Sequence, residues 1–208
     1  MNKRKLAILL VAENHAGKTK VAEGLLHLNQ KMAHYSMRTI IEMVFKDKTK
    51  EQFPKERGNI QKFSEYLKID SGSEIFLKEA MRQFQESTYE LAIIESIRAP
   101  GETLWVKSEE FQKEFPDISP WVIGLIAPVE QRYSRFLSER SDNIATALTR
   151  QVFDEHEQMS NHGIEPWEEN ISTTMEYVDF KVANLDGALQ DTVTQIHEVT
   201  LDLQKVTV

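Results

Sequence analysis

Residues 6–19 of the chain read LAILLVAENHAGKT, an apolar run followed by a polar, glycine-containing turn. The run at residues 6–12 is too short for a buried helix and ends in polar residues, which is typical of a strand buried on both faces. After the turn, Val21, Leu25 and Leu28 recur at helical spacing. The segment therefore predicts a strand, a loop and a helix in direct succession.

The loop in this segment has the residues of a phosphate-binding P-loop. Such a loop wraps backbone N–H groups around phosphate oxygens at a helix N-terminus, and it adds a lysine for the β- and γ-phosphates and a hydroxyl for Mg²⁺. Gly17, Lys18 and Thr19 fit these roles, whereas Ala12 replaces the first glycine of the pattern and loses easy access to positive φ. The alternative is a Gly-Lys-Thr that caps an ordinary helix by chance. The order of strand, loop and helix favours the P-loop. We expect the Lys18 side chain to face solvent without a ligand.

The rest of the chain alternates between short apolar runs and helical patterns. Further strands are predicted at residues 91–94 and 121–126, with a weaker one at Phe180–Ala183. Ser73 is expected to cap a helix. The apolar residues that recur at helical spacing are Ile75, Phe76, Ala80 and Phe84 in that helix and Leu189, Val193, Ile196 and Leu203 near the end. Alternating strands and helices predict an α/β fold, a three-layer α/β/α arrangement around a parallel sheet.

The length of 208 residues predicts one domain. Residues 38–86 and 132–170 show helical patterns without a strand, so we expect both to be insertions that project from the sheet. The predicted core comprises residues 1–35, 87–131 and 171–208, with inserts at about 36–86 and about 132–170.

Composition excludes several classes of protein. Lys and Arg number 25 against 33 Asp and Glu, and the net charge of -8 argues against general nucleic-acid binding. The absence of cysteine excludes disulfide scaffolds, cysteine zinc sites and thiol catalysis, and it is compatible with a cytoplasmic location. The longest apolar runs, at residues 6–12 and 121–129, fall far short of the ~18 residues that cross a bilayer. Lys3, Arg4 and Lys5 before the first run allow a signal peptide as an alternative, but no clean cleavage site follows.

Four further stretches carry a family resemblance. They are RGNIQ at 57–61, IIESIRAPGE at 93–102, APVEQRYSR at 127–135, and VDF at 178–180 with NLDG at 184–187. Together with the loop at 12–19 they resemble the P-loop nucleoside and nucleotide monophosphate kinases. The chain looks most similar to the branch of dephospho-CoA-kinase-like, adenylate-kinase-related and deoxynucleoside monophosphate kinases. The second stretch is similar to that family's strand-Asp-Gly-Ile-Arg-x-Pro-x-Glu signature, the third looks like the start of an arginine-bearing lid, and the fourth is similar to the turn that borders the adenine.

The resemblance implies a kinase that moves the γ-phosphate of ATP, with Mg²⁺, to a small phosphorylated acceptor, a nucleoside or deoxynucleoside monophosphate. It implies a P-loop fold with helical acceptor-binding and lid inserts, and small molecules as partners. The implied nucleotide-binding residues are Asn14, His15, Ala16, Gly17, Lys18, Thr19, Lys20 and Asn184, and the implied metal ligands are Thr19 and Glu95. The implied catalytic residues are Lys18, Glu95, Arg98 and Arg132, and the implied acceptor-binding residues are Arg38, Arg57, Arg98, Arg135 and Arg140.

Several alternatives stay open. Glu95-Ser96 replaces the family's Asp-Gly, and Arg38 stands where relatives have an Asp. Glu95 could be a solvated residue at the end of a strand, and each arginine could form only a surface ion pair. The six histidines have no metal-site spacing. The chain could therefore be a nucleotide-binding regulatory protein without transfer activity, or a kinase for dephospho-CoA or another small metabolite. Its oligomeric state is not predicted.

Overall fold

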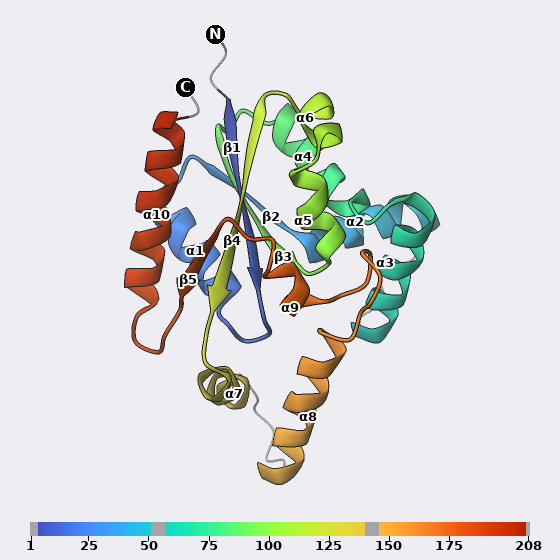
Figure 1. Cartoon of the computed structure of the whole chain (residues 1–208), viewed down its shortest axis with the longest axis vertical. Helices are drawn as coiled ribbons and strands as arrows, with labels where there is room; N and C mark the ends of the chain where they lie inside the picture. Colours follow the sequence, from blue (N-terminus) through green and yellow to red (C-terminus); the bar gives the residue numbers. More distant parts are fainter. Residues whose placement is uncertain (1–3, 51–56, 140–145, 207–208) are drawn as a thin grey trace.

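The computed structural model describes residues 4–50, 57–139 and 146–206. Its five-stranded sheet has the order β2-β3-β1-β4-β5, and every strand pair is parallel. The strands are β1 (Lys5–Ala12), β2 (Met32–Ser36), β3 (Leu91–Ile97), β4 (Ile118–Ile126) and β5 (Phe180–Ala183). Helices cover both faces of the sheet (Figure 1). The expected three-layer α/β/α fold is confirmed.

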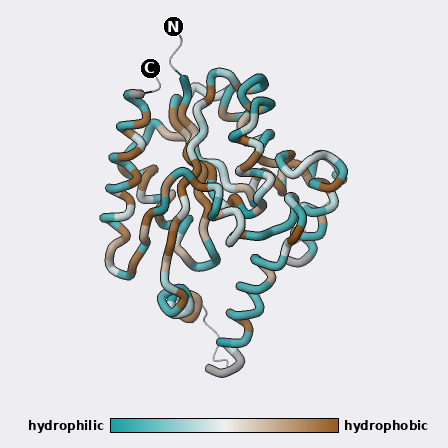
Figure 2. The backbone as a smooth tube through the Cα atoms, in the orientation of Figure 1, coloured by the Kyte–Doolittle hydropathy of each residue, from teal (hydrophilic) through white to brown (hydrophobic). Residues whose placement is uncertain are grey.

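Strand β1 lies at the centre of the sheet, between β3 and β4. Leu6 pairs with Leu91 on one side and with Ser119 on the other. Residues 6–12 of β1 are buried, because helices pack on both faces. The unbroken apolar run in the sequence follows from this position, and Figure 2 shows apolar residues concentrated along the central strands.

Strand β2 was not predicted from the sequence. Among the strands in the described ranges it lies at an edge of the sheet and pairs with β3, from Met32 opposite Leu91 to Ser36 opposite Glu95. His34 is exposed in this strand, and Tyr35 and Ser36 are half-buried. An edge strand needs no continuous apolar run, so the sequence gives a weak signal for it.

Helices α1 (Lys18–Leu28) and α10 (Leu189–Val206) cover one face of the sheet. Val21 and Leu25 of α1 and Val193 and Ile196 of α10 are buried in the core on this face, as their spacing predicted. The two helices pack closely at Gly24, where an added Cβ would lie 2.6 Å from a Val193 methyl group.

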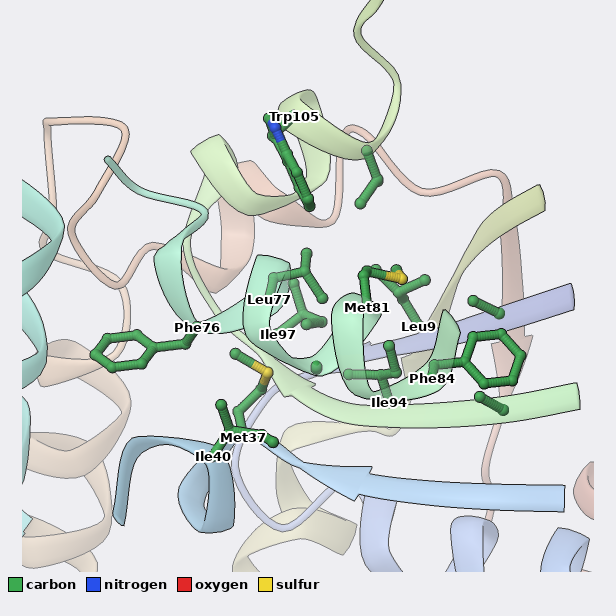
Figure 3. Close-up of a cluster of buried hydrophobic side chains, with 14 of the residues drawn as sticks. Leu9, Met37, Ile40, Phe76, Leu77, Met81, Phe84, Ile94, Ile97 and Trp105 are labelled. Atoms are coloured by element: carbon green, nitrogen blue, oxygen red, sulfur yellow. The ribbon is translucent and has the colours of Figure 1, made fainter. Parts of the chain in front are cut away.

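Helices α2 (Met37–Thr49), α4 (Ile75–Glu86), α5 (Pro100–Val106), α6 (Glu109–Glu114) and α9 (Ile171–Thr174) lie on the opposite face. Figure 3 shows Leu77, Met81 and Phe84 of α4 packed toward Leu9, Ile94 and Ile97 of the sheet, in the core that also contains Trp105.

Helix α4 differs from its expectation in two respects. We expected residues 38–86 to project from the sheet, but α4 covers it, because one side of the helix is fully apolar. The N-cap of α4 is Glu74, and the Ser73 hydroxyl donates to the Glu74 carboxylate, so Ser73 is not the capping residue.

Helices α3 (Arg57–Ser71), α7 (Val129–Ser138) and α8 (Thr146–Met159) complete the chain. The described parts of residues 38–86 and 132–170 contain helices and loops but no strand, as expected. Helices α7 and α8 lie beyond the carboxyl ends of β1 and β4, and α8 is mostly polar (Figures 1 and 2). No helix within the described ranges is both long and apolar enough to cross a membrane.

Candidate functional site

A cavity of about 820 Å³ lies where β1, β3 and β5 end. Ligands of parallel α/β sheets bind at this edge, because loops from several strands converge there. The predicted site residues that line the cavity are Asn14, His15, Gly17, Lys18, Thr19, Lys20, Arg38, Arg98, Arg135 and Asn184. The structure therefore brings most of the predicted residues to one place.

The loop at residues 12–19 contains two residues with left-handed backbone conformation and ends at the start of α1. Gly17 is the N-cap of α1 with φ of 90°, and His15 also has a positive φ, of 57°. An added Cβ at Gly17 would lie 2.4 Å from Nδ2 of Asn184, which donates a hydrogen bond to the Ala16 carbonyl. Ala12 is not among the described residues with positive φ, so its side chain causes no conflict at the first position of the pattern.

Lys18 is buried, contrary to the expectation that it faces solvent. Its side chain curls back across the loop, and Nζ donates to the carbonyl of Ala12 at 2.7 Å and to that of Glu13 at 3.2 Å. The carbonyls of Ala12 and Glu13 hold the ammonium group of Lys18, which lines the cavity.

Glu95 lies behind Thr19 and is almost fully buried, which excludes a solvated strand-end role. Thr19 Oγ1 donates to Glu95 Oε2 at 3.0 Å, and Nε2 of His34 lies 3.1 Å from Glu95 Oε1. Burial raises the pKa of Glu95, but the hydrogen bonds from His34 and Thr19, together with the nearby charges of His34 and Lys18, outweigh it, so the pKa lies below its ordinary value. Glu95 is therefore a carboxylate at neutral pH.

His34 is a residue of the site that sequence analysis missed. It comes from the edge strand β2, whose pairing with β3 brings it beside Glu95. The histidine spacing in the sequence carries no signal for this contact. Only the prediction of β2 as a strand adjacent to β3 could have found it.

Thr19 and Glu95 form a donor set suitable for Mg²⁺. Hydroxyl and carboxylate oxygens are hard ligands, and Mg²⁺ is commonly held by one or two protein groups together with phosphates and water. Among the residues that the structure describes, no cluster of three or more His, Cys, Asp or Glu could hold a metal. The Thr19 hydroxyl and the Glu95 carboxylate are oxygen ligands of the kind that Mg²⁺ takes from a protein.

Ser96, directly after Glu95, has a strained backbone. Its φ is 73°, and the pairing of β1 with β3 shifts register here, from Leu10 opposite Glu95 to Val11 opposite Ile97. Ser96 is the extra residue of this bulge and lines the cavity. It occupies the position where the family resemblance expects glycine, the residue that adopts this φ without steric cost.

Arg98 reaches the cavity from the turn after β3. Its Nη1 donates to Asn14 Oδ1 and to Glu169 Oε2, each at 3.3 Å. Arg38 lines the same cavity from the first turn of α2. Because β2 and β3 lie on the same side of β1, both arginines approach the loop from that side of the sheet.

Arg135 approaches from the opposite side, near β5. It donates to the Asn184 carbonyl at 2.8 Å and to Asp186 Oδ1 at 2.9 Å.

His15 Nδ1 lies 3.0 Å from Glu139 Oε2 at the end of α7. Burial lowers the pKa of His15 below its ordinary value, and the nearby Glu139 offsets this only in part.

Arg132 is not brought to the cavity. Its guanidinium is buried between Glu13, at 2.8 Å, and Glu157 of α8, and it donates to the Ala127 carbonyl. One carboxylate partner belongs to the loop and the other to α8, so Arg132 joins these two segments. Arg57 begins α3, but its side chain lies outside the described part of the chain, as does the whole of Arg140.

The charges that line the cavity favour anions. The cationic residues are Lys18, Lys20, Arg38, Arg98 and Arg135, and the acidic residues are Glu23, Glu139 and Asp186. The excess of cations contrasts with the net charge of -8 for the whole chain. Steering of a ligand depends on this local field and not on the net charge.

Comparisons with known proteins identify the fold. No family model matches the chain, and no curated protein matches it. Among solved structures it is similar to TT1252 from Thermus thermophilus, at 13% identity and a TM-score of 0.61 over 97% of this chain and 99% of that chain. It is similar to the tunicamycin resistance protein of Deinococcus radiodurans, at 15% identity and a TM-score of 0.56 over 95% of this chain and 96% of that chain. It is also similar to shikimate kinase from Bacteroides thetaiotaomicron, at 10% identity and a TM-score of 0.54 over 94% of this chain and 98% of that chain. The chain shares the fold of these neighbours, one of which is a shikimate kinase: a five-stranded parallel sheet with helices on both faces.

Proposed function

We propose that the protein is an ATP-dependent phosphotransferase that moves the γ-phosphate of ATP to a nucleoside or deoxynucleoside monophosphate. The observation that carries this proposal is the loop at the start of α1, with Thr19 hydrogen-bonded to the buried carboxylate Glu95 at the edge of a cationic cavity. Helix N-termini of this kind bind phosphate groups through backbone N–H groups and the helix dipole.

Donor binding falls to the loop residues. The backbone N–H groups around Gly17 hold the β- and γ-phosphates, and Lys18 turns from the carbonyls of the loop to their oxygens. Thr19, and Glu95 directly or through water, would hold Mg²⁺, which would neutralise charge on the polyphosphate. Asn184 and Arg135 lie beside Gly17 on the β5 side, where the adenosine portion would lie.

Acceptor binding falls to the opposite side of the loop. Arg38 and Arg98 line the cavity from the β2 and β3 side, so an acceptor phosphate held there faces the γ-phosphate across the start of α1. Guanidinium groups match phosphate oxygens with paired hydrogen bonds. The presence of two such groups supports a phosphorylated acceptor over a neutral one.

Phosphoryl transfer depends mainly on positioning and on stabilisation of charge, so few residues need to react. The carboxylate Glu95 is ionised and fixed by two hydrogen bonds, and it can hold a water molecule or accept a proton at Oε1 or Oε2. Arg98 holds the acceptor phosphate in line.

The test is ADP production from ATP and Mg²⁺ against a panel of acceptors. The panel comprises nucleoside and deoxynucleoside monophosphates, dephospho-CoA, and shikimate as a non-phosphorylated control. We expect one class of monophosphate to raise turnover well above the background hydrolysis of ATP. Tight ATP binding without turnover on any acceptor would instead support a nucleotide-binding protein without transfer activity. Turnover on shikimate or dephospho-CoA alone would replace the proposed acceptor.

A further inference from the structure

A buried ion pair joins helix α3 to helix α5 outside the donor site. Lys68 Nζ lies 2.9 Å from Glu102 Oε1, and the two side chains are 7% and 3% exposed. Lys and Glu are seldom buried this deeply unless they are paired. Neither residue lines the cavity, and neither has a part in the proposed transfer.

The second oxygen of Glu102 holds the turn that carries Arg98. Glu102 Oε2 accepts hydrogen bonds from the backbone N–H groups of Arg98 and Ala99, each at 3.0 Å. A continuous path of hydrogen bonds therefore runs from the ammonium group of Lys68, through one carboxylate, to the backbone of Arg98. The Arg98 guanidinium, at the end of this path, lines the cavity.

The remaining contacts of Arg98 come from other segments. Its carbonyl accepts from the Asn170 N–H and the Thr174 hydroxyl, each at 3.0 Å, and its guanidinium contacts Asn14 and Glu169. The backbone of Arg98 is thus fixed on its carbonyl side by the segment after α8 and on its N–H side by Glu102. The hydrogen bonds on the N–H side form only while the Glu102 carboxylate keeps its orientation.

We propose that Lys68 is a positioning residue for Arg98, acting through Glu102. Without its cation, the buried Glu102 carboxylate keeps the two backbone donors but bears an uncompensated desolvation cost, so it turns toward water. This rotation weakens the bonds to the N–H groups of Arg98 and Ala99. The guanidinium then loses its fixed position, and an anion that it holds is bound less tightly. The functional consequence rests on the proposed role of Arg98 in acceptor binding.

The first arm of the test measures the link itself and needs no acceptor. Amide hydrogen exchange by NMR is compared between the native chain and Lys68→Met. We expect the exchange of the Arg98 and Ala99 amides to become faster by about tenfold, and Lys68→Arg to restore most of the protection. The matched control is Lys78→Met, which removes the more exposed pair with Glu114 and should leave these two amides unchanged.

The second arm measures the consequence. With ATP and the acceptor that the panel identifies, Lys68→Met should raise the KM for the acceptor about tenfold while the KM for ATP stays within about twofold. A merely structural role would lower stability and leave both KM values of the folded enzyme unchanged, as expected for Met81→Ala in the core. If Lys68→Met does not fold, Lys68→Gln replaces it in the test. Gln keeps a neutral hydrogen-bond donor, so we expect a smaller increase in amide exchange and a smaller rise in the KM for the acceptor.

The two arms separate failure of this inference from failure of the proposed function. If no acceptor supports turnover, the proposed function is wrong, and the exchange arm still decides whether Lys68 fixes the Arg98 turn. Unchanged exchange at Arg98 and Ala99 in a folded variant would overturn the inference. Equal changes in both KM values, or none, would overturn it as well.

Discussion

The Thr19 hydroxyl donates a 3.0 Å hydrogen bond to Oε2 of Glu95, which joins the first turn of α1 to strand β3. The two residues are 76 positions apart in the sequence. Their contact brings an ionised carboxylate to the N-terminus of α1, directly after the loop that we propose binds phosphate. The proposed chemistry depends on this contact, since it provides the oxygen ligands for Mg²⁺ beside the phosphate-binding loop.

Replacement of Glu95 by Gln tests the carboxylate. We expect turnover to fall by about 10²-fold, because the charge that orders the metal and its water is lost while the shape is kept. Binding of ATP without Mg²⁺ should change little, which calorimetry can measure. The exposed Glu109 serves as the control, since Glu109→Gln should leave turnover unchanged. Native turnover in Glu95→Gln would contradict the role of Glu95.

Lys18→Ala is expected to affect both activity and stability. Transfer should be abolished, because the ammonium group that neutralises the phosphates is removed. The protein without ligand should also melt about 2–4 °C lower, since the buried contacts of Lys18 with the carbonyls of Ala12 and Glu13 are lost. Circular dichroism melting curves give the second result. An unchanged melting temperature would show that these contacts contribute no stability.

Ser96→Gly should stabilise the protein. At φ of 73° a residue with a side chain bears a steric cost that glycine does not. We expect the removal of this cost to exceed the larger loss of backbone entropy that glycine undergoes on folding. We expect the free energy of unfolding to rise by about 0.5–1 kcal/mol in urea denaturation. The opposite control is Ser96→Val, in which a β-branched side chain at the same φ should lower it. If the glycine variant is less stable, the contacts of the Ser96 side chain stabilise the protein by more than the backbone strain destabilises it.

The pH dependence of stability should contain a contribution from His15. Its pKa in the folded state is lowered by burial from the ordinary 6.5, so the unfolded chain binds more protons as the pH falls. The stabilisation from a neutral His15 is fully present above about pH 6.5 and is lost as the pH falls from there toward the lower pKa of the folded state. In urea titrations between about pH 5 and 7.5, His15→Asn should show a shallower loss of stability at low pH. Asn tolerates the positive φ at this position. Parallel curves for the two proteins would contradict this.

The central part of the fold could be predicted because its signals are local. Strand β1 is buried on both faces, so its sequence is continuously apolar, and the Gly-Lys-Thr turn must follow it directly. Strand β2 gave no such signal, because an edge strand tolerates residues such as the exposed His34. The α/β class was therefore predictable, and the extent of the sheet was not.

The loop residues of the candidate site were predictable, but the contacts between segments distant in the sequence were not. Asn14 to Lys20 lie together because they form one loop, and the arginine after β3 lies at the carboxyl edge of the sheet. The sequence contains no information on which carboxylate each arginine meets. Arg132 is consequently found between Glu13 and Glu157 and not in the cavity. His34 contacts Glu95 and Lys68 contacts Glu102, and only the folded chain creates these contacts.

The most direct test of the account is a crystal structure with a non-hydrolysable ATP analogue and Mg²⁺. We predict that the β- and γ-phosphates lie within hydrogen-bonding distance of the backbone N–H groups of Gly17, Lys18 and Thr19, with Lys18 Nζ turned from the Ala12 carbonyl onto a phosphate oxygen. An analogue bound elsewhere, with Lys18 still on the carbonyls of Ala12 and Glu13, would contradict the account.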